Sequence, residues 1–286
     1  AHLTGRSIFE LSGGEKQKVA FASIYAMSPN IYLLDEPSSN LDMDAIEDLR
    51  RTLELLKKQG KTILIAEHRI YYLRELVDRI VYIDNGAISA VFSPSQFLSI
   101  PEEQRHSMGL RALDLSKVQP RAFAENSQKP ILEVRNLSLF YKKKLVLDDL
   151  NLSAAPGEII GIIGHNGAGK STFSRSLCGL HTNCTGQILW DGKELNAKSR
   201  LKRSYMVMQD VNHQLFTESV LDEICLSMRT EDRAKAEAVL AEMDLLPYRE
   251  RHPMGLSGGQ KQRVAVASAI ASERPLIVFD EPTSGL

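Results

Sequence analysis

An internal duplication constrains the fold of this chain more than any other feature of its sequence. Residues 11–18 (LSGGEKQK) return as residues 256–263 (LSGGQKQR), and residues 34–37 (LDEP) return as residues 279–282 (FDEP). The offset is 245 positions in both cases (256 − 11 and 279 − 34). Because this period is far longer than the roughly 20–50 residues of a solenoid repeat, whole domains have been duplicated.

The chain starts and stops inside the repeated unit. Residues 1–41 match residues 246–286 at the same offset. We therefore expect the C-terminal part of one domain followed by the N-terminal part of a second. A length of 286 residues agrees with a prior of about two domains.

Composition excludes several classes of protein. With 43% hydrophobic residues, 25% charged residues and a net charge of −1, the chain has an ordinary soluble globular composition. This balance provides no basic surface for a nucleic acid backbone. No apolar run approaches the roughly 20 residues of a membrane span, and no signal peptide is visible, although the chain opens at Ala1 without a methionine. Cys178, Cys184 and Cys225 have no metal-ligand spacing, so we expect free thiols in a reducing cytosol.

The first 91 residues predict strands that alternate with helices. An apolar run at 31–34 predicts a short buried strand, and residues 62–66 predict another. Between them, residues 43–59 predict a helix that ends at Gly60 and carries an apolar stripe, formed by Ile46, Leu49, Leu53 and Leu56. Residues 80–83 predict a strand of a pair that turns at 84–86. Strand, helix and strand in this order indicate a parallel α/β sheet.

Four prolines mark residues 92–130, which we interpret as an interdomain linker with one short helix near 102–113. A new domain begins at Ile131. Alternating polarity at 131–141 and 145–152 predicts a half-exposed antiparallel sheet, and the continuous apolar run at 159–163 predicts a buried strand.

A glycine-rich loop follows that run and satisfies the pattern G-x-x-x-x-G-K-[ST]. Glycines let successive backbone N–H groups point inward and cradle phosphate oxygens, and the helix that follows adds its positive N-terminus. In this hypothesis Lys170 reaches the β- and γ-phosphates, Ser171 ligates Mg²⁺, and His165 contributes no side-chain chemistry. A glycine-rich turn with an exposed lysine is the bland alternative. The expected ATP-binding residues are Gly164, His165, Asn166, Gly167, Ala168, Gly169, Lys170, Ser171 and Thr172.

Two acids end an apolar strand at 277–279. Asp280 suits the coordination sphere of Mg²⁺, and Glu281, facing the opposite way, suits the polarisation of an attacking water. Asp35 and Glu36 hold the matching positions in the first copy. Taken alone, such acids are more often solvated residues at a strand end, but the phosphate loop favours the functional interpretation.

Further residues fit the same site. The runs Ser12-Gly13-Gly14-Glu15 and Ser257-Gly258-Gly259-Gln260 each precede a predicted helix, at 16–26 and 261–271, and form potential anion-binding nests. A helix cap explains one run well, but not why both precede Asp-Glu by the same interval. His68 is a candidate for a contact to the γ-phosphate. Gln209 is a candidate for binding Mg²⁺ and the attacking water. Tyr141 is a candidate for stacking on adenine. A lone histidine at a strand end is usually a surface residue.

Together these motifs resemble the ATP-binding cassette (ABC) ATPases, over essentially the whole chain except residues 92–130. The matching motifs are the phosphate loop, the glutamine loop at Gln209, the two signatures, the Asp-Glu pairs, the segment 38–42 after the first pair, and the switch histidine His68. The resemblance implies an α/β P-loop NTPase fold, with a RecA-like parallel sheet, an antiparallel β subdomain and a helical signature subdomain. It also implies ATP and Mg²⁺ as cofactors. The chain then holds two incomplete cassettes, residues 1–91 and 131–286.

Within that family, residues 209–216, 219–224 and 66–69 resemble the energy-coupling factor importers. Those ATPases lie on the cytoplasmic face of the membrane and pair with an energy-coupling transmembrane protein and a substrate-capture protein. The resemblance therefore implies ATP hydrolysis that drives the import of a micronutrient such as a vitamin, a vitamin precursor or a metal ion.

In the family, ATP lies between the phosphate loop of one cassette and the signature of the other. The resemblance thus pairs the two cassettes and places residues 164–172 opposite residues 12–14. The first cassette lacks its own phosphate loop, and the second ends before its switch histidine. We therefore expect the 286-residue chain by itself to bind ATP weakly and to turn it over negligibly.

Three other functions share part of this pattern. A tandem-cassette ATPase that acts on the ribosome has the same core motifs, but usually a long charged linker and an Asn-His sequence after the Asp-Glu pair. DNA-repair cassette proteins carry coiled-coil or zinc insertions, which this sequence lacks. A non-catalytic binding module requires the incomplete cassettes to be natural.

Overall fold

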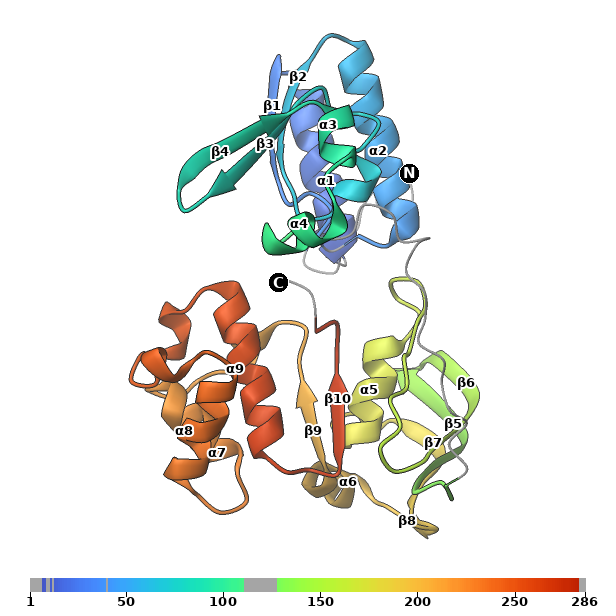
Figure 1. Cartoon of the computed structure of the whole chain (residues 1–286). Coiled ribbons are helices and arrows are strands. Elements are labelled where there is room, and N and C mark those ends of the chain that lie inside the picture. Colours follow the sequence, from blue (N-terminus) through green and yellow to red (C-terminus); the bar gives the residue numbers. More distant parts are fainter. Residues whose placement is uncertain (1–6, 9–10, 12, 40, 111–127, 283–286) are drawn as a thin grey trace. The chain divides into compact units, whose positions relative to one another are not determined.

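The computed structural model describes residues 7–8, 11, 13–39, 41–110 and 128–282 (Figure 1). The chain divides into two compact units, residues 1–123 and 124–286. Both units are of mixed α/β construction, as the sequence predicts. In the described ranges, every helix is too short or too polar to cross a bilayer.

Strands and helices alternate in the first unit. Its parallel pair β1–β2 runs in the register Leu33↔Leu64 and Asp35↔Ala66, and β3 and β4 form an antiparallel hairpin. The elements are α1 (Gly13–Ala26), β1 (Ile31–Asp35), α2 (Met43–Lys58), β2 (Thr62–Ala66), the 3₁₀ turn η2 (Ile70–Tyr72), β3 (Ile80–Asp84), β4 (Ala87–Phe92), α3 (Pro94–Leu98) and α4 (Glu102–Ser107).

Helix α2 supplies the core of the first unit. The Asp42 side chain accepts a hydrogen bond from the Ala45 N–H and caps the first turn. Ile46, Leu49 and Leu53 recur at helical spacing, and all are buried against Tyr72 and Leu73. The predicted helix and its apolar stripe are therefore confirmed. Gly60 follows in the left-handed conformation at φ +73°, which glycine adopts without a Cβ penalty.

The start of the predicted linker is folded. The Ser93 side chain and Gln96 form a capping box at the start of α3. Phe97 and Ile100 are then buried against Phe92 and Ile80. Residues 94–110 thus complete the first unit, while residues 111–127 lie outside the described part.

The second unit joins an antiparallel sheet to a parallel strand pair through one helix. The sheet order is β6-β5-β7-β8, and β9 and β10 run parallel. Helix α5 lies between the antiparallel sheet and the β9–β10 pair, and α9 lies beyond β9 (Figure 1). The elements are β5 (Leu132–Tyr141), β6 (Lys144–Ala154), α5 (Lys170–Cys178), β7 (Cys184–Trp190), β8 (Lys193–Glu194), α6 (Ala197–Arg203), β9 (Ser204–Val207), η4 (Val211–His213), α7 (Val220–Ser227), α8 (Arg233–Glu242), η5 (Leu246–Tyr248), η6 (Pro253–Gly255), α9 (Gly258–Ala271) and β10 (Leu276–Phe279).

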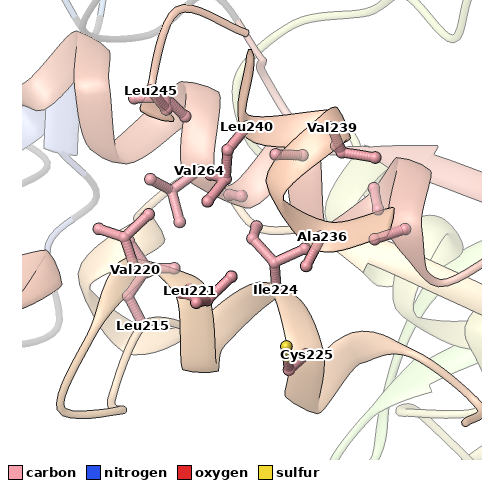
Figure 2. Close-up of a cluster of buried hydrophobic side chains, with 14 of the residues drawn as sticks. Leu215, Val220, Leu221, Ile224, Cys225, Ala236, Val239, Leu240, Leu245 and Val264 are labelled. Atoms are coloured by element: carbon pink, nitrogen blue, oxygen red, sulfur yellow. The ribbon is translucent and has the colours of Figure 1, made fainter. Parts of the chain in front are cut away.

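Helices α7, α8 and α9 form a subdomain with its own apolar core (Figure 2). Ile224 of α7, Leu240 of α8 and Val264 of α9 meet there with no exposed surface. Burial of an aliphatic side chain stabilises a fold by roughly 1.5–3 kcal/mol, so these contacts hold the short helices together. The subdomain matches the helical signature part expected from the sequence.

The structure repeats at the sequence offset. Helices α1 and α9 both have 14 residues and begin 245 positions apart, at Gly13 and Gly258. Strands β1 and β10 begin at Ile31 and Leu276, again 245 positions apart. The duplication read from the motifs therefore extends to secondary structure.

The predicted buried strand at 159–163 is wrong. These residues are irregular, and Ile159 and Ile163 are 97% and 93% exposed. A strand needs backbone partners in a ladder, and β10 pairs only with β9 among the described residues. An apolar run alone does not decide whether a segment becomes a strand, because a strand also needs hydrogen-bonding neighbours. The burial expected of residues 31–34 is also only partly right, because Leu33 is 73% exposed.

Replacement of Ile224 tests the core of the helical subdomain. We expect Ile224→Ala to lower the free energy of unfolding by about 2–4 kcal/mol, because a fully buried side chain leaves a cavity. Urea unfolding measures the change. The matched control is Leu226→Ala on the same helix, which removes a side chain that is 58% exposed and should change stability little. Equal losses in both variants would contradict the packing in Figure 2.

Candidate active site

The phosphate loop contains three glycines with positive φ. Gly164, Gly167 and Gly169 have φ of +158°, +82° and +97°, values that residues with a Cβ rarely adopt. Gly169 is also crowded, because a Cβ built there would lie 2.9 Å from Val146 Cγ1 on β6. The loop is therefore a shape that only this glycine pattern permits.

Helix α5 begins at Lys170, so its N-terminus opens onto the loop. The Lys170 ammonium donates hydrogen bonds to the carbonyl oxygens of Gly164 (2.8 Å) and His165 (3.0 Å). The positive charge thus lies across the loop, beside the positive end of the helix. Both features attract phosphate. The remaining loop residues Asn166 and Ala168 precede α5, and Ser171 and Thr172 lie in its first turn.

Two oxygen ligands for a cation meet at the end of β10. The Ser171 hydroxyl donates to the Asp280 carboxylate at 2.9 Å, although the residues are 109 positions apart. Asp280 is only 6% exposed, and its backbone N–H donates to the Val207 carbonyl of β9 at 3.0 Å. A hydroxyl and a carboxylate oxygen are the ligand types that Mg²⁺ takes in proteins. The donor set therefore fits the expected metal.

Gln209 and Glu281 form a second pair at the same strand ends. The Gln209 amide donates to the Glu281 carboxylate at 2.8 Å. Strands β9 and β10 pair in the register Val207↔Phe279, so each partner follows its strand by two residues. The structure thus brings together four of the residues that the sequence predicts for one site: Ser171, Gln209, Asp280 and Glu281.

The first unit repeats part of this arrangement. His68 Nε2 lies 3.0 Å from Glu36 Oε1, because the parallel register Asp35↔Ala66 brings the ends of β1 and β2 together. Glu36 and Glu281 both adopt the left-handed region, at φ +41° and +49°. Such a conformation costs a residue with a side chain about 1–3 kcal/mol. The two copies therefore share this backbone conformation at the acid that follows each strand.

The signature of the second unit begins α9. The Ser257 hydroxyl accepts from the Gln260 N–H (3.3 Å), and the Gln260 side chain accepts from the Ser257 N–H (2.9 Å). This capping box is the helix-cap role that the sequence analysis gave as the alternative to anion binding. In the first copy, α1 begins at Gly13 and Gly14 and has Glu15 in its first turn, whereas Ser12 lies outside the described residues. An anion-binding role for either signature stays a prediction.

Tyr141 ends β5 at the hairpin turn, where it pairs with Lys144 and is 62% exposed. The same hairpin contacts the phosphate loop, since Val146 and Leu147 of β6 approach Gly169. An exposed ring on an element that contacts the loop can stack on a flat base.

Sequence reasoning missed two residues that hold the loop after β9. Gln214 donates to the Tyr205 hydroxyl and the Met206 carbonyl, and accepts from the Met208 N–H, all at 3.1 Å. Burial raises the pKa of Tyr205, so its hydroxyl stays neutral. Glu223, 4% exposed, accepts from the backbone N–H groups of Phe216 and Thr217 at 3.0 Å. Both residues lie in segments singled out for their resemblance to the energy-coupling factor importers, Gln214 in 209–216 and Glu223 in 219–224, but nothing in those segments indicates that they hold the loop.

A groove of about 360 Å³ lies beside this loop. Its floor includes Tyr205 and Met206 of β9, and its walls come from α5, α6, α7 and the loop. Apolar side chains exposed at its edge are Leu180 (53%), Leu201 (44%), Phe216 (72%) and Leu226 (58%).

Comparison with known proteins identifies the family. The family model described as ABC transporter matches residues 1–39 and 147–284. The chain belongs to the ABC transporter family, whose ATP-binding domains bind ATP, generally with Mg²⁺, and are ATPases in general. Members of this family work with transmembrane components.

Two relatives named as ABC transporter ATP-binding proteins show how far the similarity extends. One from Treponema denticola is 46% identical over 100% of this chain and 60% of its own length. One from Methanosarcina acetivorans is 35% identical over 100% of this chain and 56% of its own length. The chain therefore spans about 60% of the length of these relatives or less.

Two solved structures are also similar. CbiO1 from Clostridium perfringens, part of the ABC transporter complex CbiONQ, has a TM-score of 0.50 and 29% identity, over 56% of this chain and 68% of its own. The archaeal ribosome recycling factor aABCE1, in complex with the ribosomal stalk protein aP1, has a TM-score of 0.68 and 26% identity, over 100% of this chain and 55% of its own.

Replacement of Gly169 tests the shape of the loop. We expect Gly169→Ala to lower the free energy of unfolding by about 1–3 kcal/mol more than Gly157→Ala, as judged by urea unfolding. Both glycines have positive φ, but a Cβ at Gly157 meets open space. The comparison thus isolates the contact with Val146 and Leu147. Indistinguishable losses would mean that β6 does not press on the loop.

Proposed function

We propose that this protein hydrolyses ATP to ADP and phosphate and so energises an importer in the membrane, of the energy-coupling factor type. The observation that carries the proposal is the pairing of Ser171 with Asp280 and of Gln209 with Glu281 beside a phosphate loop. These residues come from three separate regions of the chain. Their convergence supplies a phosphate cradle, a cation site and a base for water in one place.

Each side chain then has a distinct role. Lys170 exchanges its carbonyl contacts for the β- and γ-phosphates, while Ser171 and Asp280 hold Mg²⁺. The metal neutralises charge on the phosphates when it is bound. Glu281 accepts a proton from the attacking water, which the Gln209 amide orients. In the first unit, Glu36 and His68 provide the corresponding base and a contact to the γ-phosphate.

Each ATP would lie between half-sites from the two copies. The loop 164–172 would face the signature at Ser12, Gly13, Gly14 and Glu15, while the signature at Ser257, Gly258, Gly259 and Gln260 would serve the site that contains Glu36 and His68. Asp35 holds the metal of that second site. ATP would thus favour the closed pair of cassettes, and hydrolysis would release it.

Exposure in the first unit supports the interpretation of residues 1–91 as the C-terminal part of a cassette. Leu33 is 73% exposed. Val278, at the same position of the second copy, is 8% exposed and packs with Cys178 of α5. We propose that a helix equivalent to α5 covers Leu33 in the natural protein. Residues 131–286 would then be the N-terminal part of the second cassette, joined to the first through residues 111–130, the part of the predicted linker that follows α4.

The groove beside β9 suits a helix of the energy-coupling transmembrane protein. Its edge carries exposed Leu180, Leu201 and Phe216, which are costly to leave in water. It adjoins the loop that carries Gln209, so an occupant could sense the state of the site. The similarity to CbiO1, part of the CbiONQ transporter complex, supports this partner. The protein would lie on the cytoplasmic face of the membrane, with a substrate-capture protein as second partner, and would import a vitamin, a vitamin precursor or a metal ion.

A ribosome-acting tandem ATPase is the second candidate. The similarity to aABCE1 over the whole chain favours it. The residues after the Asp-Glu pairs, Ser38-Ser39-Asn40 and Thr283-Ser284-Gly285, differ from the Asn-His typical of that class. Affinity purification of the natural protein from cells separates the two functions. Enrichment of a membrane protein supports transport, and enrichment of ribosomal subunits supports the alternative.

Two substitutions in the natural protein test the catalytic roles. We expect Glu281→Gln to abolish hydrolysis at its site while ATP stays bound, because the amide cannot accept the proton. Lys170→Ala should abolish binding at that site. Retained radiolabelled ATP and released phosphate are the measurements, and loss of binding in Glu281→Gln would refute its role. The 286-residue chain alone should turn over ATP negligibly, because its second cassette ends before a switch histidine. Steady hydrolysis by this chain that Lys170→Ala abolishes would overturn that expectation.

A charge placed at the groove edge tests the docking site. We expect Phe216→Glu to reduce co-purification of the membrane partner at least about tenfold, since an apolar anchor is typically worth 2 kcal/mol or more. The matched control is Met254→Glu, an exposed apolar residue outside the groove lining. Quantitative immunoblots of the purified complex measure the ratio. Undiminished partner recovery with Phe216→Glu would exclude the groove as the contact.

A further inference from the structure

One carboxylate in the first unit collects hydrogen bonds from two separate segments. Glu67 Oε1 accepts from the Ser38 hydroxyl and from the Tyr72 hydroxyl (2.8 Å). Its Oε2 accepts from the backbone N–H groups of His68 (2.8 Å) and Arg69 (3.3 Å). Four donors on one ionised group make charge-assisted bonds, which are about twice as strong as neutral ones.

Arg69 also links the same two segments, and here the donor is a side chain of the segment after β2. Its guanidinium donates to the carbonyl oxygens of Ser38 (3.3 Å) and, at the limit of a hydrogen bond, Leu41 (3.5 Å). The segment after β1 is therefore fastened to the segment after β2 by a carboxylate and by a guanidinium. Neither bond belongs to the strand ladder.

Two of the donors in the network are themselves buried. Ser38 has no exposed surface, and Tyr72 is 6% exposed. Burial, with the nearby Glu67 charge, raises the pKa of Tyr72, so its hydroxyl remains a donor. The bonds from Ser38 and Tyr72 to Glu67 are part-buried, so they are less screened than surface bonds and help to fix the geometry of their partners.

The fastened segments carry both partners of the Glu36–His68 pair. His68 follows Glu67 directly and has its own N–H bound by that carboxylate. Glu36 lies two residues before Ser38, and the Ser39 N–H donates to the Glu36 carbonyl at 3.1 Å. A shift of either segment would therefore change the 3.0 Å approach of His68 Nε2 to Glu36.

We propose that Glu67 is a positioning residue for hydrolysis, which holds His68 against Glu36 by fastening residues 38–41 to residues 67–72. Glu67 itself contacts no reacting atom. The inference rests on the proposed ATPase function of the site that contains Glu36 and His68. It accounts for a charged residue next to the histidine, where a neutral one would not accept four donors.

The test compares Glu67→Gln, His68→Ala and the double variant in the natural protein that carries this sequence, with its membrane partner bound. Glutamine has the size of glutamate, but one of its two oxygens becomes an NH₂ group that faces donors. We expect Glu67→Gln to lower kcat at least about fivefold, with KM for ATP changed less than about twofold. The double variant should be no slower than His68→Ala alone, because both changes act through one histidine.

Two further variants control for folding. Glu75→Gln removes an exposed carboxylate that meets only Arg74 among the ion pairs of the described residues, and should leave kcat unchanged. Tyr72→Phe removes one of the four donors to Glu67 without adding an opposing amide. If Glu67→Gln fails to fold, Tyr72→Phe takes its place in the test, and we expect it to lower kcat as well. Circular dichroism reports folding of each protein.

The outcomes separate this inference from the proposed function. A wild-type protein without ATPase activity, or one in which His68→Ala has no effect, defeats the function assigned to the site and with it the role of Glu67. An active wild-type protein whose kcat is unchanged by Glu67→Gln overturns the inference alone. So does a loss that persists in full in the His68→Ala background, because Glu67 would then act elsewhere.

Discussion

Two parallel strands that end side by side determine where the chemistry of the second unit lies. The β9–β10 ladder sets Val207 opposite Phe279, and the next residues of each chain therefore meet at one edge. Phe173 and Leu177 of α5 pack against the antiparallel sheet, while Cys178 packs with Val278 of β10. This packing places the Ser171 hydroxyl next to the Asp280 carboxylate. Loss of the strand register would separate Gln209 from Glu281, which are 72 positions apart in the sequence.

The first unit shows the same constraint in a second copy, with an addition. Strands β1 and β2 bring Glu36 to His68, as β9 and β10 bring Glu281 to Gln209. Both glutamates adopt positive φ, so the two copies accept the same backbone strain at the same place. Around His68, however, a network through Glu67, Ser38 and Tyr72 supplements the ladder. Side-chain hydrogen bonds fix a segment that no longer has strand partners.

Patterns in the sequence predicted the elements wherever local chemistry decides. The apolar spacing of Ile46, Leu49 and Leu53 defined α2, and the alternation in residues 132–141 defined β5. The run at 159–163 failed, because its composition suits a strand but the strand requires neighbours that pair with it. Helix α3 was missed because five residues carry too short a pattern, although Ser93 and Gln96 already form a capping signal.

The sequence by itself determined which residue types are available for ATP chemistry: the glycines and Lys170 satisfy one phosphate-loop pattern, and the signatures and Asp-Glu pairs recur 245 positions apart. It also determined the duplication, which is a property of order alone. Only the tertiary structure decided that Ser171 donates to Asp280, that Gln209 meets Glu281, and that Glu67 gathers donors from two segments. The reason is physical: a hydrogen bond requires its two groups within about 3 Å, and for residues 29 to 109 positions apart only the packed chain can set that distance.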